Sequence, residues 1–110
     1  MSMEDRDGWI WLDGQFVPWR EARIHVLTHT LHYGLGVFEG IRAYRTDAGP
    51  AIFRLDEHIE RLCESAHILA MDHGYSRSEL AAACRQVITR NGLEAGYIRP
   101  LLFLGAEKLG

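Results

Sequence analysis

One strand-like stretch of the chain carries an aromatic ring, a gap and a cation on a single face. The stretch LHYGLGVFEGIRAY fills positions 31–44, and from Val37 onward its β-branched and aromatic residues, without a helical period, predict a strand. Because successive side chains of a strand point to opposite faces, Phe38, Gly40 and Arg42 share one face. The other face carries Val37, Glu39, Ile41 and Ala43. The first face is suited to a small, partly apolar anion; the alternative is a half-exposed strand in which Gly40 marks a bulge.

A second ring and cation lie close together near the end of the chain. The segment GYIRPLLFLG at positions 96–105 predicts the last clear strand. Tyr97 and Arg99 are two residues apart, so their side chains share a face of that strand. Pro100 has no N–H to donate to a sheet ladder, and it therefore predicts an edge position or a bulge at this point.

An arginine lies in the middle of a predicted amphipathic helix. Apolar residues recur at intervals of three and four, at Leu55, Ile59, Leu62, Cys63, Ala66 and Leu69. Arg61 lies between them. From the helical spacing alone, Arg61 is interpreted as a surface side chain that pairs with Glu57 or Glu64.

Turn and cap residues predict the remaining elements. Asp13 and Gly14 stand between two aromatic-rich runs, which is a strong signal for a hairpin. Residues 46–49 predict a turn into a further short strand. Ser76 begins a capping box for a second helix, and Gly92 is suited to end it. The expected fold class is α+β, a mostly antiparallel sheet with two main helices packed on one side.

Composition excludes several classes of function. The chain has 110 residues, 47% of them hydrophobic and 25% charged, as expected for one soluble globular domain. The net charge is -3 without a basic stripe, which argues against nucleic acid as a partner. No apolar run approaches the roughly 20 residues that span a membrane. The polar, acidic start gives no secretory signal, so a cytoplasmic location is expected.

Histidine and cysteine spacing does not favour a metal site. His25, His29 and His32 would share a face of a helix, but no carboxylate or cysteine completes a set of ligands. Cys63 and Cys84 have neither CxxC nor metal-ligand spacing, and we interpret them as buried thiols. The prediction is therefore no metal ion.

The motif H-Y-G-x-x-V-F-E-G-I-R, with Tyr97-Ile98-Arg99-Pro100 further along, closely resembles the branched-chain amino-acid aminotransferases. These are fold-type IV enzymes that use pyridoxal 5'-phosphate, and the resemblance covers nearly the whole chain. It implies the N-terminal small domain of such an enzyme, at residues 1–110. It also implies transfer of the amino group of leucine, isoleucine or valine to 2-oxoglutarate.

The resemblance implies a role for each candidate site residue. Arg61 falls at the position that binds the cofactor phosphate, for which a guanidinium fork is well suited. The expected substrate-binding residues are Tyr33, Phe38, Gly40, Arg42, Tyr97 and Arg99. The first three are expected to form an apolar wall. The Tyr97 hydroxyl is expected to bind the substrate α-carboxylate, and Arg99 together with Arg42 the distal carboxylate of glutamate. Tyr33 is expected to reach the partner subunit's site, which implies a homodimer or a higher oligomer.

The position of the lysine leads to a further expectation. An enzyme of this kind needs a lysine that binds the cofactor covalently. Lys108 is the single lysine among the 12 basic residues, and its Gly-flanked surroundings predict a solvated charge. In the family that lysine belongs to a second, larger domain. We therefore expect this chain to contribute no catalytic residue, and to be inactive without such a domain.

Two alternatives to this function are considered. The first is a related fold-type IV enzyme, such as a D-amino-acid aminotransferase or an aminodeoxychorismate lyase, although these resemble V-F-E-G-I-R and Y-I-R-P less well. The second is a non-catalytic binding or dimerisation domain, which would account for a missing cofactor lysine. A longer reading frame that encodes a lysine-bearing domain would favour an aminotransferase over the non-catalytic domain.

Overall fold

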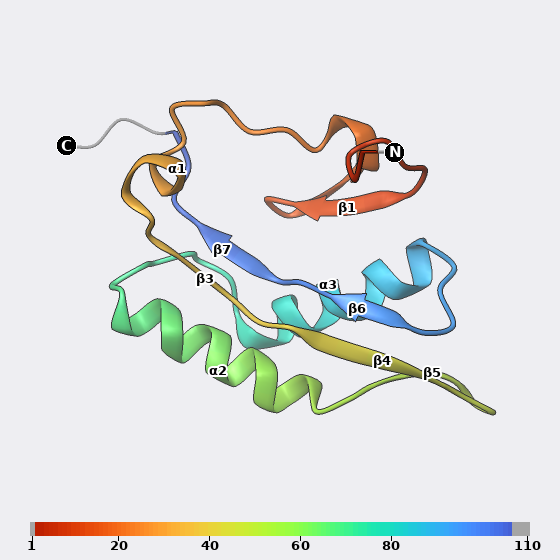
Figure 1. The fold of residues 1–110 in the computed structure, drawn as a ribbon. Coiled ribbons are helices and arrows are strands. Elements are labelled where there is room, and N and C mark those ends of the chain that lie inside the picture. The colour runs from red at the N-terminus through yellow and green to blue at the C-terminus, as the bar shows by residue number, and fades with distance from the viewer. Residues whose placement is uncertain (1, 107–110) are drawn as a thin grey trace.

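The chain folds into short antiparallel strands with two long helices. The computed structural model describes residues 2–106, so Lys108 lies outside the described residues. In chain order the elements are β1 (Trp9–Leu12), β2 (Gln15–Pro18), a 3-10 helix (Trp19–Glu21), α1 (His29–Tyr33), β3 (Gly36–Phe38), β4 (Ile41–Thr46), β5 (Gly49–Ile52), α2 (Leu55–Ile68), α3 (Arg77–Arg90), β6 (Gly96–Ile98) and β7 (Leu101–Phe103). Every strand pairing described is antiparallel. Figure 1 shows this arrangement, which confirms the predicted α+β class.

Each of the two predicted long strands is divided in two, and the two breaks lie next to each other. β3 and β4 are separated by Glu39 and Gly40, and β6 and β7 by Arg99 and Pro100. Within residues 2–106, β3 pairs only with β7, whereas β4 pairs with β6 and β5. The strand predicted from Val37 onward and the strand predicted over 96–105 are therefore each divided, at the positions where Gly40 and Pro100 indicated a bulge. Pro100 gives the physical reason, since it offers no N–H to the ladder, and its carbonyl instead accepts a hydrogen bond from the Glu39 N–H at 3.1 Å.

Alternation of side chains continues through the break. Ile41 and Ala43 are buried in the core, while Phe38, Gly40 and Arg42 are exposed. Two adjoining strand pieces therefore still present one common outer face. The predicted grouping of faces is confirmed, although the strand that carries it is split.

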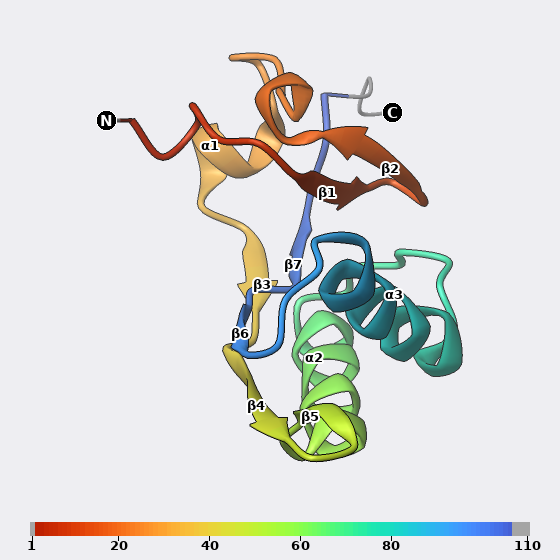
Figure 2. The ribbon, with the colours of Figure 1, turned by 90° about the vertical axis from the view of Figure 1, so that its right-hand side faces the viewer.

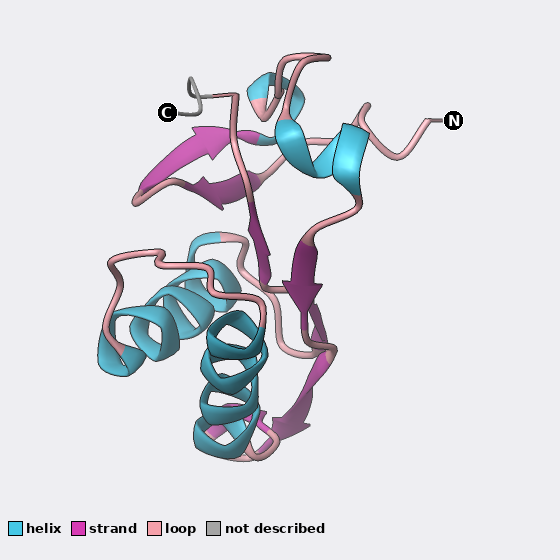
Figure 3. Cartoon of the chain, turned by 90° about the vertical axis from the view of Figure 1, so that its left-hand side faces the viewer, coloured by secondary structure: helices cyan, strands magenta, loops and turns pink. Residues whose placement is uncertain are grey.

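The two long helices cover the inner face of these strands. The core combines Ile41 and Ile98 of the sheet with Ile59 and Leu62 of α2 and with side chains of α3. Figures 2 and 3 view the molecule from opposite sides, and both show α2 and α3 on the same side of β3 and β4. This confirms two main helices packed on one side. The predicted cap is present, because the Glu79 N–H donates to the Ser76 hydroxyl at 3.1 Å.

The Asn91 amide binds the N-terminal hairpin to the end of α3, where the Arg90 guanidinium also lies over the Trp9 ring, 4.3 Å from its centroid. The hairpin turns at Asp13 and Gly14, both with positive φ, as predicted. The Asn91 Oδ1 accepts from the Trp9 N–H at 2.8 Å, and its Nδ2 donates to the Trp9 carbonyl at 3.1 Å. The same Nδ2 donates to the Val87 carbonyl at 2.8 Å. One side chain thus satisfies both backbone groups of Trp9 and ties β1 to the helix.

We expect Asn91→Ala to loosen this attachment. The substitution leaves both partly buried backbone groups of Trp9 without a partner, at a cost of about 1–3 kcal/mol in the free energy of unfolding. Hydrogen exchange of the Trp9 amide should accelerate more than exchange in α2. The control is Gln86→Ala, which removes an exposed amide from the same helix. Equal effects of the two substitutions would show that Asn91 does not hold the hairpin.

Candidate functional site

The outer face of the strand break gathers four of the predicted site residues. The Arg99 guanidinium lies over the Phe38 ring, 4.3 Å from its centroid. Its Nη2 and Nε donate to the Tyr97 hydroxyl at 2.8 and 3.3 Å. Gly40 faces this cluster so closely that a Cβ there would collide with the Tyr97 hydroxyl. A ring, a cation and a phenol therefore meet over a gap that only glycine leaves open.

The remaining two substrate-binding candidates lie at different distances from this cluster. Arg42 is exposed and stands directly opposite Tyr97 in the pairing of β4 with β6. Directly opposed residues of an antiparallel pair point to the same face, so Arg42 borders the cluster. Tyr33 does not join it. Tyr33 ends α1, at the far end of β3 from the break, with 64% of its surface exposed and its ring stacked on His29 (Figure 1).

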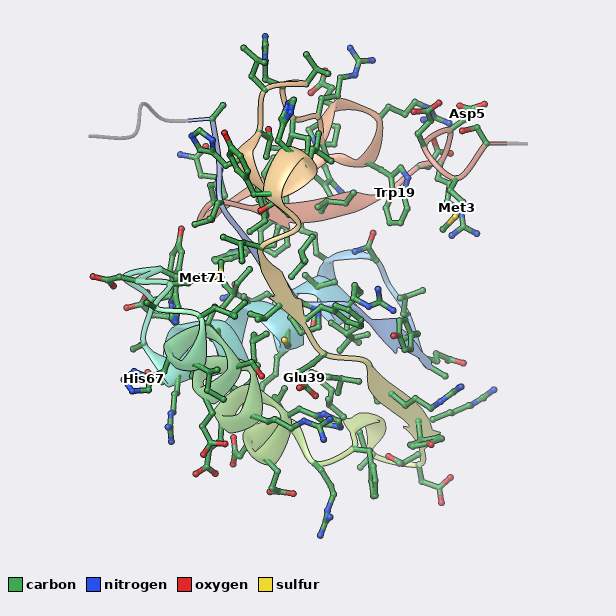
Figure 4. All side chains as sticks on the ribbon, turned by 60° about the vertical axis from the view of Figure 1, so that its left-hand side comes forward. Met3, Asp5, Trp19, Glu39, His67 and Met71 are labelled. Carbon is green, nitrogen blue, oxygen red and sulfur yellow. The ribbon has the colours of Figure 1, made fainter. Side chains whose placement is uncertain are left out.

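The inner face of the break holds a residue to which the sequence patterns assigned no role. Glu39 is 5% exposed, and Figure 4 shows it pointing from the strand toward α2. The Arg61 Nε donates to its Oε2 at 2.8 Å, and the Arg61 Nη2 donates to its Oε1 at 2.7 Å. The His58 Nδ1 lies 2.8 Å from the same Oε1. A carboxylate on an otherwise apolar strand face was the available signal, because a buried charge requires a partner.

This ion pair corrects the surface interpretation of Arg61. Among the described residues its carboxylate partner is Glu39, not Glu57 or Glu64. Glu57 instead pairs with Arg54, at 3.2 Å. Helical spacing suggested partners within α2, but the fold offers a buried carboxylate on the neighbouring strand, with two parallel hydrogen bonds. Even with this contact, 66% of the Arg61 side-chain surface is exposed.

Electrostatics at this position favour the ionised carboxylate. The hydrogen bond from Arg61 is the main cause that lowers the pKa of Glu39, and the contact with His58 lowers it further. Burial alone would raise this pKa, so the basic partners outweigh the loss of hydration. The same bond raises the pKa of the Arg61 guanidinium. The pair is therefore favoured in its charged form at neutral pH.

Both cysteines are free thiols. Cys84 is buried as predicted, whereas Cys63 is only partly buried. Burial raises the pKa of the Cys84 thiol to about 11, which leaves it unreactive. Within residues 2–106, no three His, Cys, Asp or Glu side chains gather in a way that could hold a metal ion. None of the helices in that range has the length and apolar character required to cross a bilayer.

Comparison with known proteins identifies the family to which the chain belongs. Residues 36–110 match the model of the amino-transferase class IV family, and the chain belongs to that family. The branched-chain-amino-acid aminotransferase of Pseudomonas aeruginosa is 59% identical over 110 residues, which cover all of this chain and 36% of that protein. The Escherichia coli K12 enzyme is 48% identical over 102 residues, covering 93% of this chain and 33% of its own. The chain spans about a third of the length of these relatives.

Solved structures of such enzymes have the same fold. The branched-chain amino acid aminotransferase of T.th. in complex with N-(5'-phosphopyridoxyl)-L-glutamate has a TM-score of 0.90 at 52% identity. The match covers 96% of this chain and 35% of that one. The Escherichia coli enzyme gives a TM-score of 0.90 at 47% identity, with 96% and 36% covered. The family resemblance drawn from the sequence motifs is thereby confirmed.

The ion pair at Glu39 predicts a specific dependence of stability on pH. A carboxyl whose pKa falls on folding stabilises the native state above its unfolded value, near 4.5, and this contribution is lost as the pH falls through the folded pKa. Glu39→Gln should therefore cost about 1–3 kcal/mol near neutral pH, because charge-assisted hydrogen bonds are lost. The difference from the wild type should shrink in acid, where the wild type also loses its carboxylate.

Denaturant unfolding across this pH range measures the difference directly. Glu64→Gln removes an equal charge from the exposed face of α2 and serves as the control, with an expected difference near zero throughout. A penalty for Glu39→Gln that is the same at neutral and acidic pH would mean that Glu39 contributes through packing and not through its charge.

Proposed function

We propose that this chain is the small domain of a pyridoxal 5'-phosphate-dependent branched-chain aminotransferase. The full-length protein would transfer the amino group of leucine, isoleucine or valine to 2-oxoglutarate. The observation that carries the proposal is the cluster at the strand break, where a cation lies over an aromatic ring beside a phenol. The T.th. structure with a phosphopyridoxyl-glutamate adduct supports this cofactor and this acidic substrate.

The cluster suits two unlike substrates. A branched apolar side chain can rest against the Phe38 ring without meeting an unpaired polar group. A glutamate or 2-oxoglutarate side chain would bring a carboxylate into the same space, which is costly unless a cation pairs with it. Arg99 can supply that cation, with Arg42 at the border of the cluster, while the Tyr97 hydroxyl can bind the α-carboxylate common to both substrates.

The Arg61 side chain can receive a phosphate group. Its Nε and Nη2 bond Glu39, and the side chain is otherwise exposed, so Nη1 is free to donate to phosphate oxygens. When bound, pyridoxal phosphate supplies the electron sink for amino-group transfer. In this proposal Arg61 retains the phosphate, and the cluster of Phe38, Tyr97 and Arg99 orients the substrate.

The proposal assigns the rest of the enzyme to parts outside this domain. A second, larger domain would carry the lysine that binds the cofactor. Tyr33 is highly exposed on α1 and away from the cluster, which suits a side chain that enters the site of a partner subunit. The enzyme would then be a homodimer or a higher oligomer in the cytoplasm.

A direct assay of the full-length protein tests this function. We expect amino-group transfer from leucine, isoleucine and valine to 2-oxoglutarate when pyridoxal phosphate is supplied. D-alanine and aminodeoxychorismate serve as comparison substrates for the related fold-type IV enzymes. Turnover of either comparison substrate, with none of the three branched amino acids, would contradict the proposal.

Arg61→Ala should destabilise the fold, because it leaves the buried Glu39 carboxylate without its guanidinium partner. In the folded full-length protein it should also weaken cofactor binding, because the contact with the phosphate is lost. The lost contact is a charge-assisted hydrogen bond worth about 1.5–3 kcal/mol, or roughly ten- to hundred-fold in affinity. Equilibrium titration with pyridoxal phosphate measures the change. Arg77→Ala removes a charge from the exposed face of α3 and is the control. Unchanged affinity for Arg61→Ala would remove Arg61 from the phosphate site.

Arg99→Met should separate the two half-reactions. For glutamate, the fall in kcat/KM should correspond to a loss of about 2–4 kcal/mol of transition-state stabilisation, because the distal carboxylate loses its partner. For leucine, which has no second carboxylate, the loss should be much smaller. Single-turnover kinetics of each half-reaction give both values, with Arg45→Met on the exposed end of β4 as the control. Equal losses would mean that Arg99 serves the shared α-carboxylate or the fold.

A further inference from the structure

Glu39 connects the helix that carries Arg61 to the strands that carry the substrate cluster. Its carboxylate receives two hydrogen bonds from Arg61 and contacts His58, both on α2. Its backbone N–H donates to the Pro100 carbonyl, in the other broken strand. Its two neighbours in sequence, Phe38 and Gly40, face the opposite way into the cluster. Glu39 is therefore held to α2 by its side chain and to the other broken strand by its backbone.

The hydrogen bonds leave one part of the Arg61 guanidinium available. A guanidinium has five N–H donors in a rigid, planar fork. Glu39 occupies the edge formed by Nε and Nη2, so both N–H groups of Nη1 point away from the carboxylate. Because the group is planar, binding one edge fixes the direction of the other. The orientation of Nη1 is thus set by Glu39.

We infer that Glu39 is a positioning residue, which holds Arg61 ready for the cofactor phosphate without touching the cofactor itself. The inference rests on the proposed function, in which Arg61 binds that phosphate. It gives the buried carboxylate a role at the opposite face of the strand from the substrate cluster. Since Glu39 lies between Phe38 and Gly40, it also fixes the distance between the phosphate-binding and substrate-binding parts of the site.

A competing role of Glu39 predicts the opposite effect on cofactor affinity. A carboxylate near a phosphate repels it, so Glu39 could also weaken cofactor binding. Two observations favour positioning. Glu39 is bonded to the Arg61 guanidinium, which offsets its charge, and its Oε1 also lies 2.8 Å from the His58 Nδ1. Moreover, Arg61 is long and mostly exposed, so without Glu39 it would sample many rotamers and would have to be ordered by the phosphate.

Binding of two probes to the full-length protein, freed of cofactor, distinguishes these roles. The probes are pyridoxal phosphate and pyridoxal, which lacks the phosphate. Glu39→Gln should weaken binding of pyridoxal phosphate about tenfold. In metal sites, loss of a residue that orients a metal ligand weakens metal binding by about ten- to hundred-fold, and the expected effect lies at the lower end of that range. Pyridoxal binding should not change. In the background of Arg61→Ala, Glu39→Gln should have no further effect, because a positioning residue acts only through the group it positions.

The test has a control variant and defined outcomes that would contradict the inference. Glu64→Gln, three residues from Arg61 on the exposed face of α2, should leave both affinities unchanged. Tighter binding of pyridoxal phosphate by Glu39→Gln would mean that the carboxylate competes with the phosphate. Equal losses for both probes, or a loss that persists beside Arg61→Ala, would mean general damage to the fold. Each of these results overturns the inference alone.

Two further outcomes complete the test. A wild-type protein that binds pyridoxal phosphate no better than pyridoxal would overturn the proposed function together with this inference. If Glu39→Gln fails to fold, Glu39→Asp keeps the charge but draws the carboxylate back by one methylene group. A smaller, still phosphate-specific loss is then expected, and unchanged affinity for pyridoxal phosphate would overturn the inference.

Discussion

A buried carboxylate places the strongest single constraint on this structure. Glu39 is almost fully buried, and an ionised carboxylate in that position is tolerated only where basic partners replace its hydration. Both partners, Arg61 and His58, come from α2. The helix must therefore pack against the strand with one particular rotation, since any other would leave the charge without a partner. Apolar packing of Ile59 and Leu62 is less demanding, because hydrophobic contacts have no directional preference.

The breaks in the two strands place the candidate site next to this buried carboxylate. Pro100 interrupts one strand and Glu39 with Gly40 the other, so the regular ladder between the two strands is interrupted there. Alternation persists across the interruption, which keeps Glu39 inward and Phe38 outward. Gly40 lacks the side chain that would displace the Tyr97 hydroxyl, and Arg99 can then lie over the Phe38 ring. Ion pair and cluster thus occupy opposite faces of the same few residues.

Local patterns predicted much of this from the sequence. Alternation placed Phe38 and Gly40 on one face, and the spacing of Tyr97 and Arg99 placed them on another, because both signals lie within a few residues. The hairpin turn and the Ser76 cap are local in the same way, and both are confirmed.

What the sequence could not predict depends on segments that are distant in the chain. The partners of Glu39 follow 19 and 22 residues later, across two strands, the turn between them and part of a helix. Helical spacing therefore suggested Glu57 and Glu64 for Arg61, both of them wrong. The break in the first strand likewise depends on a proline about 60 residues away, in the strand that pairs with it. Contact between Arg99 and Phe38 required the register of that pairing, which neither segment specifies by itself.

Arg61 has the central part in the proposed site, because it would bond Glu39 and a cofactor phosphate at the same time. A crystal structure of the full-length protein with pyridoxal phosphate tests this most directly. We predict that the Nε and Nη2 bonds to Glu39 remain, at about 2.7–2.9 Å, while Nη1 lies within hydrogen-bond distance of a phosphate oxygen. An Arg61 that has left Glu39 to bind the phosphate, or a phosphate bound without Arg61, would contradict this role.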